Sequence, residues 1–193
     1  MKIILIACLG NPGKEYEKTR HNAGFMFADY FWENFRKEFN FSDWKFKKRL
    51  NAKISVGKTE EKKIILLKPQ TFMNLSGQAV SEAMKYFIQN KTCNSLIVIH
   101  DEIDLPLGSF RFSKDSSSAG HKGVQNIIDQ LDTKNFTRLR IGIENHSKFT
   151  SQTSKKKTLT EKYVLKKFAN TELKILKKTL ETSSGELIDK IKK

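Results

Sequence analysis

The polar residues of this chain that could do chemistry stand where short apolar runs end. Asn11 follows the first apolar run, Asn74 follows a later one, and residues 100–104, with the sequence His-Asp-Glu-Ile-Asp, follow a third. His21 lies between Asn11 and a helical pattern. In open α/β sheets the carboxyl ends of neighbouring strands meet at a crevice, so residues far apart in sequence can converge there. A histidine near the start of a helix is more often a cap or a surface residue, but the asparagines and carboxylates at the other strand ends favour a catalytic role for His21.

Spacing argues against several other catalytic arrangements. The segment 10–15, Gly-Asn-Pro-Gly-Lys-Glu, lacks the interval and the hydroxyl residue of a phosphate-binding loop, and no dinucleotide fingerprint is present in the first turn. No serine lies in a G-x-S-x-G elbow, and neither Cys8 nor Cys93 has an adjacent histidine. We therefore expect water to be the nucleophile. Residues 100–104 could bind a hard divalent cation, and that alternative stays open here.

The charge of the chain predicts a polyanionic partner. Of its 193 residues, 36 are Lys or Arg and 21 are Asp or Glu, which gives a formal net charge of +15. This excess surrounds a small protein with a positive field and fits nucleic acid. The two cysteines have no metal-binding or disulfide spacing, so we expect a cytoplasmic location. No apolar run approaches the roughly 18 to 20 residues of a membrane span, and we expect no membrane partner.

Apolar periodicity predicts a single α/β domain over residues 1–193. Apolar runs predict strands over residues 3–9, 52–57, 63–67, 96–99, 110–113 and 139–143. Helical spacing predicts helices over residues 22–39, 76–87, 124–131 and about 171–192, with Asn22 as the cap of the first. We expect residues 144–160, rich in Ser, Thr and Lys, to form a loop. The alternation of strands and helices predicts a central mixed, mostly parallel sheet sandwiched by helices.

Five longer motifs carry a resemblance to a known family. They are residues 10–24 (Gly-Asn-Pro-Gly-Lys-Glu-Tyr-Glu-Lys-Thr-Arg-His-Asn-Ala-Gly), 69–77 (Pro-Gln-Thr-Phe-Met-Asn-Leu-Ser-Gly), 100–108 (His-Asp-Glu-Ile-Asp-Leu-Pro-Leu-Gly), 120–123 (Gly-His-Lys-Gly) and 138–142 (Arg-Leu-Arg-Ile-Gly). In this order they resemble the signatures of the bacterial peptidyl-tRNA hydrolase family, over residues 3 to about 168. The resemblance implies a monomeric enzyme without metal or cofactor. It implies hydrolysis of the ester bond between a peptide and the 3′ ribose of tRNA.

The resemblance also implies roles for four residues. His21 is the base that takes a proton from water, and Asp101 orients it and favours its protonated form. Asn11 and Asn74 hold the substrate and the water. The chemistry agrees, because a carboxylate on one ring nitrogen stabilises the imidazolium formed at the other. Amides can donate to a developing oxyanion without adding charge.

On the RNA side, the resemblance places Tyr16 and Phe72 beside the substrate, where an aromatic face can stack on the terminal adenosine. We expect three cationic side chains to contact the tRNA: Arg111, Lys122 and Arg140. Lys122 is a departure from the family, which usually has Asn at this place in the fourth motif. We assign it to substrate binding.

Two other functions stay open on the sequence. A non-catalytic RNA-binding protein could share this fold, although pure binding needs no ordered general base such as His21. A metal-dependent hydrolase of small substrates could use residues 100–104, but it would leave the charge of +15 unexplained. Hydrolysis of N-blocked and of free aminoacyl-tRNA in the presence of a chelator distinguishes these possibilities.

Overall fold

The apolar run at the amino terminus forms the strand at the centre of the fold. β1 (Lys2–Cys8) is buried from Ile4 onward and pairs with a parallel strand on each side. A strand covered on both faces can be apolar at successive positions, because neither face meets water. The sequence Ile-Leu-Ile-Ala-Cys therefore becomes the middle of the sheet.

The computed structural model describes residues 1–88, 95–145 and 156–192. The further strands there are β2 (Lys45–Lys47), β3 (Ala52–Lys58), β4 (Lys62–Pro69), β5 (Leu96–Pro106), β6 (Phe110–Lys114) and β7 (Thr137–Glu144). The α-helices there are α1 (Ala23–Phe35), α2 (Ser76–Phe87), α3 (Lys122–Leu131), α4 (Lys156–Val164) and α5 (Asn170–Lys192). Short 3₁₀ helices are η1 (Lys14–Tyr16), η2 (Arg20–Asn22), η3 (Lys48–Leu50) and η4 (Met73–Leu75).

The seven strands of the described residues form one sheet in the order β2-β3-β4-β1-β5-β7-β6. β4, β1, β5 and β7 run parallel in its centre. β2, β3 and β6, toward the two edges, run antiparallel to their neighbours. Parallel neighbours need crossover connections, and helices supply them. The predicted α/β domain with a mixed sheet, mostly parallel in its centre, is confirmed.

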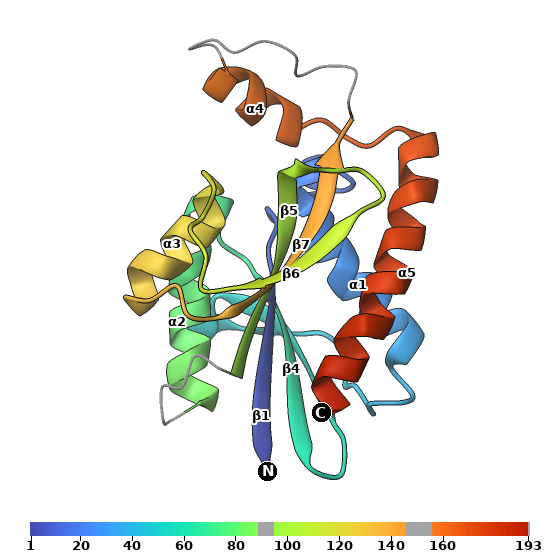
Figure 1. The fold of residues 1–193 in the computed structure, drawn as a ribbon. Coiled ribbons are helices and arrows are strands. Elements are labelled where there is room, and N and C mark those ends of the chain that lie inside the picture. Colours follow the sequence, from blue (N-terminus) through green and yellow to red (C-terminus); the bar gives the residue numbers. More distant parts are fainter. Residues whose placement is uncertain (89–94, 146–155, 193) are drawn as a thin grey trace.

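Helices cover both faces of the sheet, as Figure 1 shows. α1 and α5 pack on one face, where Phe27, Phe31 and Leu176 belong to one apolar cluster. α2 and α3 pack on the other face, with Val80 and Ile127 in a second cluster. The fully buried aromatic residues of α1, Phe27 and Phe31, therefore belong to the core.

The first helix is shorter than the sequence predicted. It was expected over residues 22–39 but ends at Phe35. The chain then turns through Asn40, whose positive φ of 50° is one that asparagine tolerates. This turn returns Phe39 and Phe41 to the core, so the apolar pattern continues after the helix has ended. β2 was missed altogether, because it has only three residues, Lys-Phe-Lys, and all of them are exposed.

The loop expected over residues 144–160 is only partly described. β7 includes Glu144, residues 146–155 lie outside the described residues, and α4 begins at Lys156, so the prediction was wrong at both ends. α4 has few apolar residues, so the sequence showed no apolar periodicity from which this helix could be predicted. At its end Tyr163 and Val164 enter the core. None of the helices in the described residues is long and apolar enough to cross a membrane.

Candidate active site

A close approach of two backbones places His21. It lies in η2, directly before α1, and the amide of Phe25 near the start of that helix donates to the carbonyl of Leu9 at 3.1 Å. A Cβ on Gly24 would lie 2.5 Å from the carbonyl oxygens of both Leu9 and Ile99, so glycine is needed at this position. The start of α1, and His21 with it, therefore sits against β1 and β5.

The acidic segment that was expected to follow the fourth strand is part of that strand. The strand was predicted to end at Ile99, but β5 continues to Pro106, so that prediction was wrong. It therefore includes His100, Asp101, Glu102 and Asp104. The strand continues because β7 pairs with it through this region. Asp101 and Glu102 are each only 3% exposed. Burying a carboxylate is costly without partners, and both of these side chains have partners from other elements.

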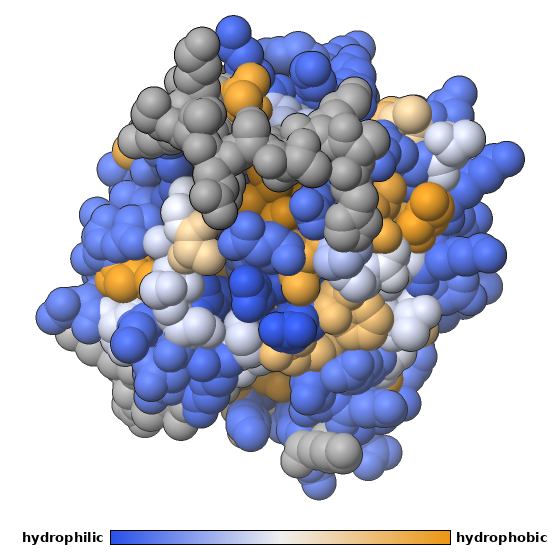
Figure 2. Space-filling view, turned by 45° about the horizontal axis from the view of Figure 1, so that its top comes forward, coloured by the Kyte–Doolittle hydropathy of each residue, from blue (hydrophilic) through white to orange (hydrophobic). Residues whose placement is uncertain are grey.

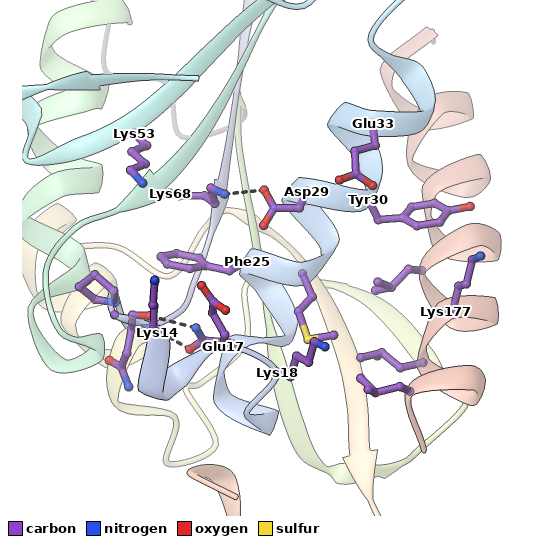
Figure 3. Close-up of a pocket in the computed structure, with 18 of the residues that line it drawn as sticks. Lys14, Glu17, Lys18, Phe25, Asp29, Tyr30, Glu33, Lys53, Lys68 and Lys177 are labelled. Carbon is purple, nitrogen blue, oxygen red and sulfur yellow. Dashed lines mark hydrogen bonds and ion pairs between the residues drawn. The ribbon is translucent and has the colours of Figure 1, made fainter. Parts of the chain in front are cut away.

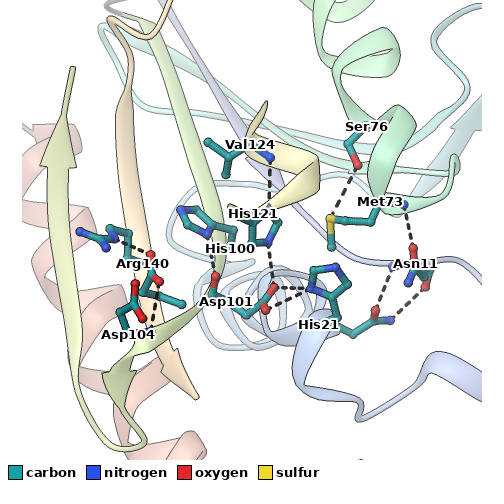
Figure 4. A network of polar contacts seen from close by, with 12 residues as sticks. Asn11, His21, Met73, Ser76, His100, Asp101, Asp104, His121, Val124 and Arg140 are labelled. Carbon is teal, nitrogen blue, oxygen red and sulfur yellow. Dashed lines mark hydrogen bonds and ion pairs between the residues drawn. The ribbon is translucent and has the colours of Figure 1, made fainter. Parts of the chain in front are cut away.

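Asp101 joins two histidines that approach it from different elements (Figure 4). Its carboxylate oxygens lie 2.9 and 3.0 Å from Nδ1 of His21. Its Oδ1 also lies 3.0 Å from Nε2 of His121, the residue before α3. The two imidazole centroids are 5.0 Å apart. The side chains of His21 and His121 are 12% and 8% exposed, so the network is largely sheltered from water.

The hydrogen-bond pattern determines where the protons lie. Nδ1 of His121 accepts from the amide of Val124 at 3.2 Å, as the N-cap of α3. That nitrogen carries no proton, so Nε2 of His121 carries it and donates to Asp101. An ionised carboxylate only accepts, so Nδ1 of His21 donates to it as well. The lone pair of neutral His21 is then on Nε2, where it can take a proton from water.

The charge of Asp101 survives its burial. Burial opposes ionisation of Asp101, but the positive charge that the two imidazoles carry when protonated and the hydrogen bonds that they donate outweigh it, and they hold the pKa of Asp101 well below its usual range. His100 is fully buried, and its Nδ1 lies 2.7 Å from the carbonyl oxygen of Asp101, to which it donates. Burial first, then His121 and Arg138, hold the pKa of His100 well below its usual value. His100 is therefore a neutral neighbour of the network.

The same network is a possible metal site by distance alone. One ligand atom each from His21, Asp101 and His121 lies within 4.8 Å of the others. A metal on Nε2 of His121 would move the single proton of the neutral ring to Nδ1, which could then no longer accept from Val124. Metal binding would therefore cost α3 its cap. The geometry favours a proton-transfer network.

Asn11 is held so that its amide nitrogen remains for a ligand. Its Oδ1 accepts from the amide of Met73 at 2.8 Å, which fixes the orientation of the side chain. Asn22 was expected to cap α1, but it makes no cap hydrogen bond. Its side chain instead accepts from the N–H of Asn11 at 2.8 Å and donates to the carbonyl of Asn11 at 3.0 Å. Since Asn22 follows His21 directly, the free amide of Asn11 is tied to the position of the histidine.

The other expected substrate residues lie on neighbouring loops. Asn74 is exposed in η4, next to Met73. The rings of Tyr16 and Phe72 meet edge to face, with centroids 6.2 Å apart. Phe72 is 55% exposed, as a stacking platform requires. Figure 2 views the molecule with this end turned forward, and apolar side chains lie there among strongly hydrophilic ones.

The three cationic side chains that were expected to contact tRNA differ in their exposure and in whether they pair with a carboxylate. Arg111 is exposed on β6 and lies opposite Arg140 of β7. Arg140 donates from Nε to Glu102 at 2.8 Å, and its side chain is 19% exposed, so its charge is largely balanced within the fold. Lys122 is the first residue of α3, and its ammonium lies 2.8 Å from Glu161 on α4. Of the three, Arg111 is the one without a carboxylate partner among the described residues.

A cavity of about 740 Å³ borders the candidate site at Asn11 (Figure 3). It extends along α1 toward α5, and neither His21 nor Asp101 lines it. Its lining includes Lys68, which pairs with Asp29 at 2.5 Å. Cavity size therefore does not mark the histidine network, which is identified by its hydrogen bonds.

The chain is similar to known proteins over most of its length. A family model described as peptidyl-tRNA hydrolase matches residues 5–192. The chain belongs to the peptidyl-tRNA hydrolase family. The peptidyl-tRNA hydrolase of Thermodesulfovibrio yellowstonii is 48% identical over 141 residues, which are 73% of this chain and 72% of that protein. The one from Mycoplasma mycoides is 43% identical over 179 residues, 93% of this chain and 87% of that protein.

Solved structures agree with the family. The crystal structure of the peptidyl-tRNA hydrolase from Acinetobacter baumannii matches with a TM-score of 0.79 at 31% identity. The match covers 95% of this chain and 85% of that one. The similarity therefore includes the C-terminal helix, which the sequence motifs left outside the resemblance.

His121 is the member of the network that the sequence did not assign. It stands in the fourth motif of this chain, Gly-His-Lys-Gly at residues 120–123, where only Lys122 received a role. His121 lies three residues before the start of the helix predicted over residues 124–131, and histidine is not among the preferred N-cap residues, so the local sequence contains no clear signal for its role. Its bond to Asp101 depends on how α3 docks against β5, which spacing along the chain does not reveal.

Proposed function

We propose that this chain hydrolyses the ester bond between a peptide and the 3′ ribose of tRNA, with His21 as the general base. The observation that carries the assignment of the base is the 2.9 Å hydrogen bond between Nδ1 of His21 and Asp101, which leaves Nε2 free. Family membership supports peptidyl-tRNA as the substrate. A protein that only bound RNA would have no use for a buried carboxylate that holds a histidine in one tautomer.

The first step is attack by water. Nε2 of His21 takes a proton from the water as its oxygen bonds to the ester carbonyl carbon, and an electron pair moves to the carbonyl oxygen. Asp101 stabilises the imidazolium, because it accepts from Nδ1 throughout the step. Nδ2 of Asn11 and the amide of Asn74 donate to the peptide carbonyl and to the oxyanion, and this preorganised polarity adds no charge.

The second step returns the proton. As the tetrahedral intermediate collapses, the bond between the carbonyl carbon and the 3′ oxygen breaks, and that oxygen takes the proton from Nε2 of His21. The base is thereby restored, and the products are the free peptide and tRNA with a 3′ hydroxyl. One imidazole accounts for both proton transfers, so we assign no metal or cofactor to the reaction.

Asn11 accounts for discrimination against aminoacyl-tRNA. Its Oδ1 is committed to Met73, so it presents a donor to the substrate. A peptide carbonyl can accept from that donor. The free ammonium of aminoacyl-tRNA has only donors, and it would lose water without gaining a partner. The substrate therefore needs an acylated α-amine.

Aromatic and cationic side chains near the site can bind the tRNA part of the substrate. Tyr16 and Phe72 offer aromatic faces for the terminal adenosine, and the exposed Arg111 offers charge for phosphates. Arg140 and Lys122 would have to leave their carboxylate partners to bind phosphate, so we expect Arg111 to contribute most to phosphate binding. We further propose that the chain acts as a monomer in the cytoplasm.

The test compares N-acetylated with free aminoacyl-tRNA, with and without EDTA, in the wild type and in His21→Ala. We expect hydrolysis of the N-acetylated substrate alone, no effect of EDTA, and a fall of about 10² to 10⁴ in kcat for His21→Ala. Binding of tRNA to that variant should be unchanged. Equal hydrolysis of both substrates would contradict the role of Asn11. A loss in EDTA that added metal reverses would contradict the metal-free mechanism.

A further inference from the structure

Arg20, the residue before His21 in η2, is buried against the carboxy-terminal part of the chain. Its Nη2 lies 2.7 Å from both carboxylate oxygens of Glu172, on α5. Its Nη1 donates to the carbonyls of Lys166 and Lys167 at 3.2 and 3.0 Å. The side chains of Arg20 and Glu172 are 8% and 10% exposed, so this is a buried ion pair.

Further contacts hold the same loop. The guanidinium carbon of Arg20 lies 4.5 Å from the ring centre of Tyr163 and 5.1 Å from that of Phe168. The amide of Arg20 donates to the carbonyl of Lys166 at 3.1 Å, and the amide of Phe168 donates to the carbonyl of Lys18 at 2.9 Å. Main chain and side chain therefore both fix the loop to one segment. We call that segment, residues 163–172, the clamp.

Glu172 is the hub of the clamp. Its Oε2 accepts from the amide of Ala169 at 2.7 Å, and its Oε1 accepts from Nδ2 of Asn145 at 3.1 Å, in addition to the bonds from Arg20. Burial opposes its charge, but these hydrogen bonds and Arg20 outweigh it and lower the pKa of Glu172. The carboxylate is therefore ionised and fully engaged at neutral pH.

This ion pair contributes more to the position of the main chain than to the stability of the fold. A buried ion pair is weak evidence for stability, because both charges lose their water. A guanidinium with several fixed acceptors does define the position of the main chain that carries it. Here that main chain leads directly into His21. On the other side of the histidine, Asn22 is bonded to Asn11, so His21 is held from both directions.

We propose that Arg20 and Glu172 are positioning residues for His21. They hold the main chain of η2 so that Nδ1 of the imidazole stays on Asp101 and Nε2 stays on the attacking water. The kinetic consequence rests on the proposed function. A misplacement of about 1 Å costs about 10²-fold in rate. Loosening the clamp therefore lowers kcat, whereas tRNA affinity, which depends on other surfaces, does not change.

Glu172→Gln tests the clamp, because it keeps the size of the side chain and removes the negative charge that pairs with Arg20. We expect kcat to fall by about 10- to 100-fold with an unchanged Kd for tRNA. Arg20→Lys keeps a charge and loses the planar fork, and kcat falls as well. Asn145→Ala, which removes one hydrogen bond to Glu172, is the mildest variant and gives the smallest fall. Leu187→Ala is the matched control, since this residue of α5 is fully buried but lies far along the helix from the clamp.

The ring of His21 gives a readout that does not depend on activity. The chain has four histidines, so ¹⁵N-histidine NMR of the full chain, assigned with His21→Ala, resolves the proton on Nδ1 of His21. That proton should exchange faster in Glu172→Gln and Arg20→Lys than in the wild type and in Leu187→Ala. Wild-type kcat and wild-type His21 signals in the clamp variants would overturn the proposal, as would an equal fall of kcat in Leu187→Ala. A wild-type chain inactive on peptidyl-tRNA would overturn the proposed function alone, because the NMR comparison would still decide on the clamp.

Discussion

The substitution Asp101→Asn replaces one carboxylate oxygen by an amide group and should disturb the base directly. In the native site Oδ1 accepts from both His21 and His121, whereas Oδ2 accepts from His21 alone. Asparagine has one acceptor and one donor group. With its oxygen in the place of Oδ1, its NH₂ group would stand 3.0 Å from Nδ1 of His21, so two donors would face each other.

The neutral imidazole of His21 can resolve this conflict by moving its proton from Nδ1 to Nε2. Nδ1 then accepts from the asparagine, and the lone pair that should receive a proton from water is lost. Even if the tautomer persisted, the hydrogen bond to a charged acceptor would be lost, which is worth about 1.5 to 3 kcal/mol or about 10- to 100-fold in rate. The corresponding tautomer change in serine proteases costs about 10⁴. We therefore expect kcat of Asp101→Asn to fall by about 10² to 10⁴.

The assay is hydrolysis of N-acetylaminoacyl-tRNA at saturating concentration, with the free energy of unfolding measured in urea on the same preparations. Asp104→Asn is the matched control, because Asp104 lies on the same strand with its side chain exposed, and it should keep the wild-type kcat. A folded Asp101→Asn variant with kcat within about tenfold of the wild type would refute the reasoning, since the site would then work in either tautomer.

Three further predictions concern His121, Glu172 and Arg111. His121→Ala removes a donor to Asp101 and the cap of α3, so urea unfolding should show a loss of about 0.5 to 2 kcal/mol and kcat should fall by about tenfold. The pKa of Glu172 is lower in the folded chain than the unfolded value of about 4.3, so its stabilisation is present above that pH and is lost as the pH falls through the folded value. The free energy of unfolding should accordingly fall less steeply below about pH 4.3 in Glu172→Gln than in the wild type. Arg111→Ala should reduce the slope of log KM against log salt by about 0.7 to 0.9, whereas Lys178→Ala, on the exposed face of α5, should leave it unchanged. If a variant gives the wild-type value in its measurement, the role assigned to the contact that it removes is wrong.

The sequence predicted the fold best where an element buries its own apolar pattern. β1, β4 and α2 were located because each places apolar residues against a core at the spacing of its type. β5 was predicted too short, because its second half is charged and those charges are compensated by distant residues. Glu102 bonds to Arg140, and Asp101 bonds to His21 and His121. A local pattern contains no information about such partners.

The residue types of the candidate site could be predicted more fully than their hydrogen bonds. Asn22 has the position of a helix cap, yet it binds the main chain of Asn11, because η2 folds back on the first loop. Lys122 has the charge of a phosphate ligand, yet it pairs with Glu161. Both outcomes depend on which segments the sheet brings together.

A helix cap on the opposite face of the sheet fixes the tautomer of His121, the second donor to Asp101. The amide of Val124 needs an acceptor, and Nδ1 of His121 supplies it, which puts the proton of that ring on Nε2. Asp101 then receives a donor from each side, and His21 keeps its lone pair on the nitrogen that faces away from the carboxylate. Lys122 stands at the first position of this helix, where a positive charge opposes the helix dipole. Its pairing with Glu161 offsets that charge, so Lys122 is compatible with both the cap of α3 and the tautomer of His121.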